Sequence, residues 1–199
     1  TLVHLTPGYW TQAAHRRTGL WRRGRVYRIG VWYWELEEAP AEWRHQCDYL
    51  DEVWGPTRFI ADCLRKVMHV PVVDMMPGIE LPRFVPRARA QLGVPEDRFV
   101  FLYMFDMNST FARKNPLAVI RAYREAFAAT EPVHVVIKVI NAQSDMASFE
   151  RLKREAAKGG VTILSERLSR PDVYALVDAC DAYVSLHRSE GYGMTLAEA

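Results

Sequence analysis

The sequence predicts an α/β protein with parallel sheets, organised as two Rossmann-like domains. Short β-branched and aromatic runs alternate with segments of helical period, as in strand–helix units. From residue 99 onward, four such units follow one another in order. A proline-rich stretch separates them from the first part of the chain. We therefore expect one domain over residues 1–76, a linker over 77–86 and a second domain over 87–199.

Three strands and two helices are expected before the linker. The strands are Val26–Val31, Glu52–Trp54 and Val70–Asp74, and the helices are Ala41–Leu50 and Arg58–Lys66. Thr57 has the side chain of an N-cap for the second helix, and Ile60 and Leu64 then fall on one face of it.

The predicted linker is rich in residues that interrupt regular structure. It contains Pro77, Gly78, Pro82 and Pro86, and a proline neither continues a helix nor donates a hydrogen bond within a central strand. A long loop inside one domain would explain the same residues, so that alternative stays open.

Strands and helices alternate more regularly after the linker. The expected strands are Phe99–Phe105, Val133–Ile140, Val161–Leu164 and Ala182–Leu186. The expected helices are Pro116–Ala129, Met146–Lys158, Pro171–Asp178 and one that begins after a glycine-rich turn near the end of the chain. Pro116 stands in the first turn of the helix Pro116–Ala129, and Gly159-Gly160 follows the last turn of the helix Met146–Lys158.

Composition excludes several classes of protein. The net charge of +2 is too small for nucleic acid to be the main partner, and no apolar run approaches the roughly 20 residues that span a bilayer. Cys47, Cys63 and Cys180 lie far apart, which favours neither disulfides nor zinc and fits a reducing, cytoplasmic setting. The chain begins at Thr1 and stops at Ala199 inside a helical pattern, so we expect a fragment.

The most informative segment runs from Ser185 to Glu198. A strand leads in, a Gly-x-Gly turn follows Glu190, and a helix leads out. The turn is therefore expected at the carboxyl edge of the sheet, where open α/β folds bind ligands.

This segment has the chemistry to hold a sugar diphosphate. Gly191 and Gly193 let the backbone approach a ligand, and Glu190 and Glu198 can accept hydrogen bonds from sugar hydroxyls. Backbone amides that can donate to phosphate oxygens belong to Tyr192, Gly193, Met194 and Thr195. Two glutamates on a solvated face give the same spacing, so spacing alone leaves both interpretations open.

The same segment resembles the Glu-x7-Glu motif of family 4 of the retaining glycosyltransferases. The match covers the strand, the His-Arg-Ser-Glu-Gly-aromatic-Gly turn, the helix and the second glutamate. The resemblance implies the GT-B fold, here the end of the N-terminal, acceptor-side domain and most of the C-terminal, nucleotide-sugar-binding domain. It also implies that Glu190 contacts the transferred hexose and that Glu198 holds the nucleotide ribose. His187 borders the motif and is expected to orient the donor.

A basic pair, Arg113-Lys114, precedes the helix that starts at Pro116. Two cations there can neutralise a diphosphate as it leaves. The pattern resembles the Arg/Lys signature of the same family, which implies that Lys114 binds the diphosphate. The family's arginine five residues earlier is absent because Ser109 stands there, which leaves open whether Arg113 replaces it. A solvated basic loop is the alternative.

The region before the linker also resembles the end of the N-terminal domain in this family. Trp34 and Glu35 follow a strand and could face a ligand cleft between the two domains. A tryptophan at such a place more often belongs to the core, which we favour for Trp34. Five arginines crowd around Leu20 and Trp21, namely Arg16, Arg17, Arg22, Arg23 and Arg25. Such a patch suits peripheral contact with an anionic membrane surface, and a solvated loop explains it equally well.

The predicted function is retaining transfer of a hexose from a nucleoside diphosphate sugar to a glycan or lipid-linked acceptor. We expect a cytoplasmic location at the inner face of the membrane and no cofactor. The resemblance also implies that no metal is needed, because in that family amides and basic side chains take the metal's role. The alternatives are a nucleotide-sugar epimerase or phosphorylase on the same fold, or a non-catalytic nucleotide-sugar-binding protein. Nothing in the sequence identifies the base, the sugar or the acceptor.

Overall fold

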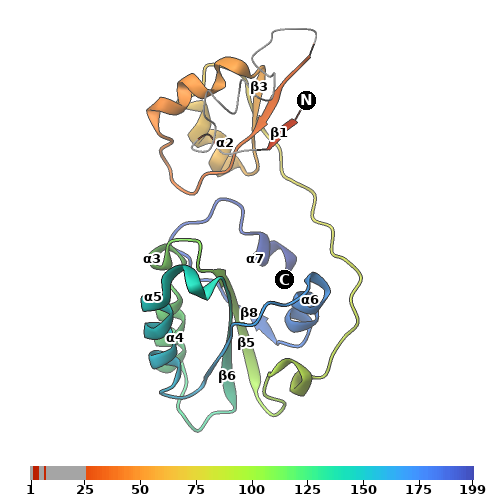
Figure 1. The fold of residues 1–199 in the computed structure, drawn as a ribbon, viewed down its shortest axis with the longest axis vertical. Coiled ribbons are helices and arrows are strands. Elements are labelled where there is room, and N and C mark those ends of the chain that lie inside the picture. Colours follow the sequence, from red (N-terminus) through yellow and green to blue (C-terminus); the bar gives the residue numbers. More distant parts are fainter. Residues whose placement is uncertain (1, 5–6, 8–25) are drawn as a thin grey trace. The chain divides into compact units, whose positions relative to one another are not determined.

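The structure, a computed structural model, describes residues 2–4, 7 and 26–199. The chain divides into two compact units, Thr1–Gly78 with Ser189–Gly193, and Ile79–Arg188 with Met194–Ala199 (Figure 1). Each unit holds one four-stranded sheet in which every pair of neighbouring strands is parallel. The predicted α/β class with parallel sheets is therefore confirmed. The arginine cluster of residues 16–25 lies outside the described residues.

The sheet of the first unit has the order β1-β2-β3-β4. Its strands are β1 (Leu2–His4), β2 (Ile29–Val31), β3 (Glu52–Gly55) and β4 (Val72–Asp74). The expected strand Val26–Val31 is shorter than predicted. The backbone N–H of Arg28 donates to the Asp51 carboxylate at 2.8 Å, so a side chain takes the place of a partner strand there.

Two helical segments complete the first unit. α2 (Arg58–Arg65) begins as predicted, since the Thr57 hydroxyl accepts from the Ile60 backbone N–H. The expected α-helix over Ala41–Leu50 is instead a 3₁₀ helix, η2 (Ala41–Tyr49). No side chain caps the start of this helix. The Trp43 N–H instead donates to the Pro40 carbonyl three residues earlier, a bond of the 3₁₀ type that satisfies an amide otherwise left without a partner.

Trp34 belongs to the packing of the first unit, the interpretation that the sequence favoured. Its ring lies 4.7 Å from that of Trp43, and its indole N–H donates to the Glu38 carbonyl. The buried core around it includes Trp32, Trp43, Cys47, Val53, Ile60 and Leu64.

The sheet of the second unit has the order β7-β6-β5-β8. The strands are β5 (Phe99–Asp106), β6 (Val133–Ile140), β7 (Val161–Leu164) and β8 (Ala182–Tyr183). The chain moves outward from β5 through β6 to β7 and then returns to the other side of β5. The Asp181 carboxylate secures this return by accepting from the Val100 backbone N–H at 2.7 Å. The order reverses between β5 and β8, which makes this the topological switch point of the sheet.

Helices cover both faces of this sheet (Figure 1). α4 (Pro116–Ala126) and α5 (Met146–Ala156) pack on one face through Val119, Ile120, Phe149 and Leu152. α6 (Arg170–Asp178) packs on the other face, where Leu176 meets Val100, Leu102, Met104 and Val136. The two apolar faces explain why β5 and β6 are almost continuously hydrophobic.

Several boundaries differ from the prediction. α4 ends at Ala126 because Phe127 is extended, with φ −126°. α5 ends at Ala156, before a turn in which Gly159 and Gly160 have positive φ. The chain leaves the sheet after β8, where the Leu186 carbonyl accepts from the Asn115 side chain and Arg188 N–H donates to the Arg113 carbonyl.

The remaining elements are short or irregular. They are η3 (Arg89–Leu92), α3 (Phe111–Lys114), η4 (Ala142–Asp145) and α7 (Met194–Glu198). Residues 75–88 contain no helix or strand. Within the described part of the chain, no helix has the length and apolar character needed to cross a membrane.

Candidate functional site

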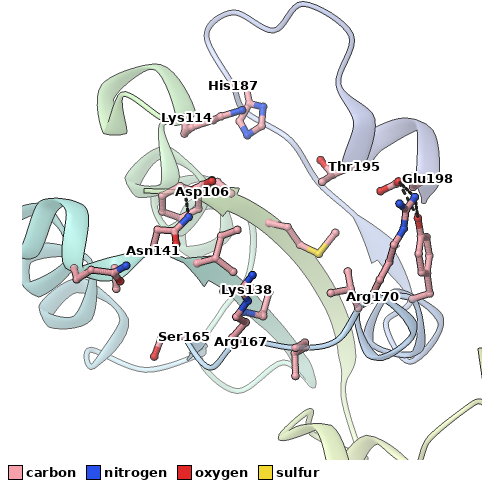
Figure 2. A pocket seen from close by; sticks show the side chains of 18 residues that line it. Asp106, Lys114, Lys138, Asn141, Ser165, Arg167, Arg170, His187, Thr195 and Glu198 are labelled. Carbon is pink, nitrogen blue, oxygen red and sulfur yellow. Dashed lines mark hydrogen bonds and ion pairs between the residues drawn. The ribbon is translucent and has the colours of Figure 1, made fainter. Parts of the chain in front are cut away.

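A cavity of about 740 Å³ opens at the carboxyl edge of the second sheet (Figure 2). The ends of β5 and β6 form its floor, and residues from α6, α7 and the segment after β8 form its walls. Its polar lining residues are Asp106, Lys114, Lys138, Asn141, Gln143, Ser165, Arg167, Arg170, Tyr174, His187, Thr195 and Glu198. The cavity therefore lies at the switch point, where open α/β sheets bind their ligands.

One wall presents an oriented carboxylate, that of Glu198. The Tyr174 hydroxyl donates to Glu198 Oε1 at 2.8 Å, and an Arg170 guanidinium nitrogen lies 3.5 Å from the same oxygen (Figure 2). Tyr174 is only 4% exposed, and burial raises the pKa of its hydroxyl, which therefore remains a donor at neutral pH. Both contacts fix one oxygen and orient the carboxylate toward the cavity.

The start of α7 is also held in place. The Tyr183 hydroxyl, on β8, donates to the Thr195 hydroxyl at 2.7 Å. Thr195 lines the cavity one helical turn before Glu198. Two tyrosines from different elements therefore position this wall.

Lys114 lies at another end of the cavity, with His187 (Figure 2). It is the last residue of α3, and its carbonyl accepts a short hydrogen bond from the Tyr103 hydroxyl. Asn115, which follows, has a left-handed backbone with φ 55° and separates α3 from α4. The His187 ring stands edge-on to that of Tyr103, with the ring centroids 5.5 Å apart.

The floor carries a buried cation, Lys138 of β6. Its side chain is among the few charged groups of the described residues that are buried, and it is 3% exposed. Its ammonium donates to the carbonyl oxygens of Val139 at 3.1 Å and Glu166 at 2.6 Å. Burial lowers the pKa of Lys138, and the charge of Glu166 opposes this effect only in part.

Asp106 ends β5 and is held by two amides. The Asn141 side chain and the Asn108 backbone N–H each donate to its carboxylate at 2.8 Å. Asn141, like Asn115, has a left-handed backbone, with φ 56°. These bonds satisfy the carboxylate locally and tie the loops that follow β5 and β6.

The formal charges around the cavity do not cancel. Four cations (Lys114, Lys138, Arg167 and Arg170) face two carboxylates (Asp106 and Glu198), so four minus two leaves +2. A cavity with a surplus of positive charge concentrates anions. The arrangement is therefore suited to a ligand that combines a dianionic group with hydroxyls for the carboxylate wall.

The structure brings together some of the residues singled out in the sequence. Lys114, His187, Thr195 and Glu198 line one cavity. Arg113 and Met194 are not lining residues, although they neighbour residues that are.

The turn of the motif belongs to the first unit. Glu190, Gly191, Tyr192 and Gly193 fall in the segment Ser189–Gly193, which is grouped with Thr1–Gly78. The Thr57 hydroxyl donates to the Gly191 carbonyl, and the Tyr192 hydroxyl donates to the Pro77 carbonyl, each at 3.3 Å. The roles expected for these four residues stay predictions.

Sequence reasoning missed most of the polar residues that line the cavity, among them Lys138, Arg170 and Tyr174. A signal was present for the first, because Lys138 is the sole charged residue in the apolar run Val133–Ile140. Arg170 and Tyr174 are four positions apart on one helix and so share a face, but nothing local links them to Glu198.

A parallel sheet with a positively charged cavity at its switch point is typical of a Rossmann-type domain, and the surplus of positive charge suits an anionic ligand. Residues 84–199 match the model of the family described as glycosyl transferases group 1. The chain belongs to this family.

Similar proteins agree with this assignment. A D-inositol 3-phosphate glycosyltransferase from Arthrobacter sp. (strain FB24) is 25% identical over 177 residues, which cover 81% of this chain and 41% of that protein. The chain thus spans less than half the length of this curated relative.

Solved structures show the fold. A sucrose-phosphate synthase from Thermosynechococcus elongatus matches with a TM-score of 0.70 and 15% identity, over 99% of this chain and 53% of that one. The pneumococcal O-GlcNAc transferase GtfA, solved with UDP and GlcNAc, matches with a TM-score of 0.58 and 16% identity, over 100% of this chain and 39% of that one. The neighbours are GT-B glycosyltransferases, so the predicted GT-B class is confirmed.

Proposed function

We propose that the protein is a retaining glycosyltransferase that moves a hexose from a nucleoside diphosphate sugar to a glycan or lipid-linked acceptor. The observation that carries the proposal is the cavity of the second unit, in which a surplus of positive charge and the oriented Glu198 carboxylate occur together. A nucleoside diphosphate has the matching groups, two or more negative charges and a pentose with two hydroxyls in UDP and GDP or one in dTDP.

The size of the cavity suits such a donor. Its volume of about 740 Å³ lies within the roughly 300–1,000 Å³ of typical small-molecule sites. The Glu198 carboxylate would accept hydrogen bonds from the ribose hydroxyls, since Tyr174 and Arg170 already fix its orientation. Lys114 would neutralise the diphosphate as charge builds on it during departure.

The other residues of the motif receive their roles from the family resemblance. Glu190 would contact the hexose, the amides of the turn would donate to the diphosphate, and His187 would orient the donor. Retention at the anomeric carbon and independence of metal ions rest on the same resemblance. The relatives support the donor class, because one of them was solved with UDP and GlcNAc.

Location at a membrane surface is a separate part of the proposal. It rests on the arginine cluster of residues 16–25, which would hold the protein near lipid-linked acceptors.

Calorimetry tests the donor class. Titration of UDP, GDP and dTDP in EDTA should give heat with at least one of them, because cations of the protein would replace a metal. Absence of binding by all three would contradict the proposal.

Product analysis tests the reaction. Incubation of the matching nucleotide-sugar with glycan and lipid-linked acceptors should release nucleoside diphosphate and give a glycosylated acceptor with the donor's anomeric configuration, measured by NMR. Conversion of the donor to an isomer without an acceptor would indicate an epimerase instead. Binding without turnover would indicate a nucleotide-sugar-binding protein.

A further inference from the structure

We propose that Lys138 is a ligand of the donor diphosphate, a second cation contributed by the floor of the cavity in addition to Lys114. The inference rests on the proposed function for the identity of the anion, but its starting point is the environment of Lys138.

Lys138 is buried without an ion-pair partner among the described residues. The side chain is 3% exposed, and it lines the cavity. Its partners are two neutral carbonyls, those of Val139 and Glu166, and among the described residues no carboxylate lies within ion-pair distance. An ammonium has three N–H donors, so two carbonyls leave one donor unused and no ion pair, and the charge of Glu166 offsets the burial only in part.

Burial of the Lys138 charge has an energetic cost. A buried cation without an anion is strongly unfavourable compared with an apolar side chain of the same size. The neighbours of Lys138 in β6, from Val135 to Val139, are buried hydrophobic residues, so packing gives no reason for a lysine here. An anion that enters the cavity would compensate the charge.

Lys138 differs in exposure from the two arginines that line the same cavity. Arg170 is paired with Glu198, and its side chain is 64% exposed, while Arg167 is exposed to solvent. Water screens exposed charges, whereas a buried charge acts through a lower effective dielectric constant. Per charge, Lys138 therefore attracts an anion in the cavity more strongly than the two arginines do.

The position of Lys138 in the cavity also suits contact with a diphosphate. Lys138 is paired in register with Met104 of β5, and both residues line the cavity. Lys114 follows β5 through α3 and lines the same cavity. In Figure 2 Lys138 lies on the floor of the cavity, below Lys114, His187 and Glu198 in that view. A diphosphate linked to a ribose on Glu198 would cross this floor on its way to Lys114.

A structural role is the competing explanation. Lys138 holds the carbonyl of Glu166 and so attaches the loop between β7 and α6 to the floor. If that were its purpose, the charge itself would be unnecessary, and loss of Lys138 would affect every ligand of the cavity equally.

The test uses Lys138→Met in the whole protein, with Lys153→Met as the matched control. Lys153 lies on α5 and is not a lining residue, its side chain is 46% exposed, and it pairs with Glu150. Calorimetry measures the affinity for the nucleoside diphosphate that binds the wild type (UDP, GDP or dTDP) and for the corresponding nucleoside. Thermal denaturation without ligand is measured in parallel.

Lys138→Met should weaken diphosphate binding by about ten- to a hundredfold and leave nucleoside binding within about twofold. The control should bind both ligands like the wild type. The unliganded Lys138→Met protein should melt at the same temperature as the wild type or higher, because an unpaired buried charge is removed. Lys138→Gln, which keeps a donor but not the charge, should show the same selective loss.

Unchanged diphosphate binding, or equal losses for nucleoside and diphosphate, would overturn the inference. Failure of both variants to fold would overturn it too, because the fold itself would then require the charge. If the wild type binds none of the three nucleotides, the proposed function fails before any variant is made, so the two failures are distinguishable.

Discussion

The bond between Tyr174 and Glu198 offers a sharp test of the donor site. Replacement of Tyr174 by Phe removes the hydroxyl that donates to Glu198 Oε1 at 2.8 Å and keeps the ring. Arg170 remains 3.5 Å from the same oxygen, so the carboxylate keeps a charged neighbour but loses its closest contact. We expect the donor site to become less ordered without loss of the α6 packing.

The size of the effect follows from this geometry. A hydrogen bond to a charged group contributes about 1.5–3 kcal/mol, and the remaining arginine should keep the loss near the lower end or below it. Since about 1.4 kcal/mol corresponds to a tenfold change in affinity, KM for the donor should rise by about three- to tenfold. The kcat should stay near the wild-type value, because ribose contacts are the same in ground state and transition state.

A double-mutant cycle with Glu198→Gln measures whether Tyr174 acts through Glu198. The donor KM and kcat are determined for wild type, both single variants and the double variant. In the Glu198→Gln background, Tyr174→Phe should change KM by less than about twofold, because the carboxylate that it orients is gone.

Tyr123→Phe is the matched control. The Tyr123 hydroxyl donates to the Val133 carbonyl at 3.1 Å, and Tyr123 does not line the cavity. Its loss should lower the melting temperature slightly and leave the donor KM unchanged. Additive effects of Tyr174→Phe and Glu198→Gln on KM would show that Tyr174 does not act through Glu198, and an equal effect of Tyr123→Phe would show that the loss is not specific to the donor site.

Three further predictions concern the charged groups of the site. Lys114→Ala should weaken binding of the nucleoside diphosphate by about ten- to a hundredfold with little change for the nucleoside, measured by calorimetry; equal losses would place Lys114 away from the diphosphate. Glu190→Gln should depress kcat, whereas Glu198→Gln should mainly raise KM for the donor, because only the hexose gains positive charge in the transition state; a normal kcat for Glu190→Gln would remove the role assigned to it. Burial lowers the pKa of Lys138 below its ordinary value of 10.5, so between the two values the unfolded chain binds more protons than the folded one. The free energy of unfolding should therefore rise with pH in that window for the wild type relative to Lys138→Met, and a flat difference in denaturant titrations would contradict it.

The sequence predicted best the elements that local chemistry determines. α2 begins where Thr57 provides a cap, and β5 and β6 follow from two long apolar runs. The type and ends of other elements depend on distant partners. β8 is two residues long, and beyond it the Leu186 carbonyl accepts from the side chain of Asn115, 71 positions away.

The candidate site was only partly predictable for the same reason. Lys114 and Glu198 stand in recognisable local patterns, and both line the cavity. Tyr174 became relevant only when the fold placed its hydroxyl beside a carboxylate 24 positions away. Lys138 shows the opposite case, since a lone lysine in a buried strand is visible in the sequence before its neighbours are known.

The return of the chain to β5 affects the rates at which the cavity forms during folding and is lost during unfolding. The bond between Val100 and Asp181 joins residues 81 positions apart, and such a long closure is expected late in folding. In the sequence, Lys114 and Lys138 lie before Asp181, whereas His187 and Glu198 lie after it. The complete cavity therefore forms only after β8 has paired with β5. A nucleotide would find no site in the transition state for folding. It should leave the refolding rate unchanged and slow unfolding, so that occupied protein lasts longer against heat and proteases.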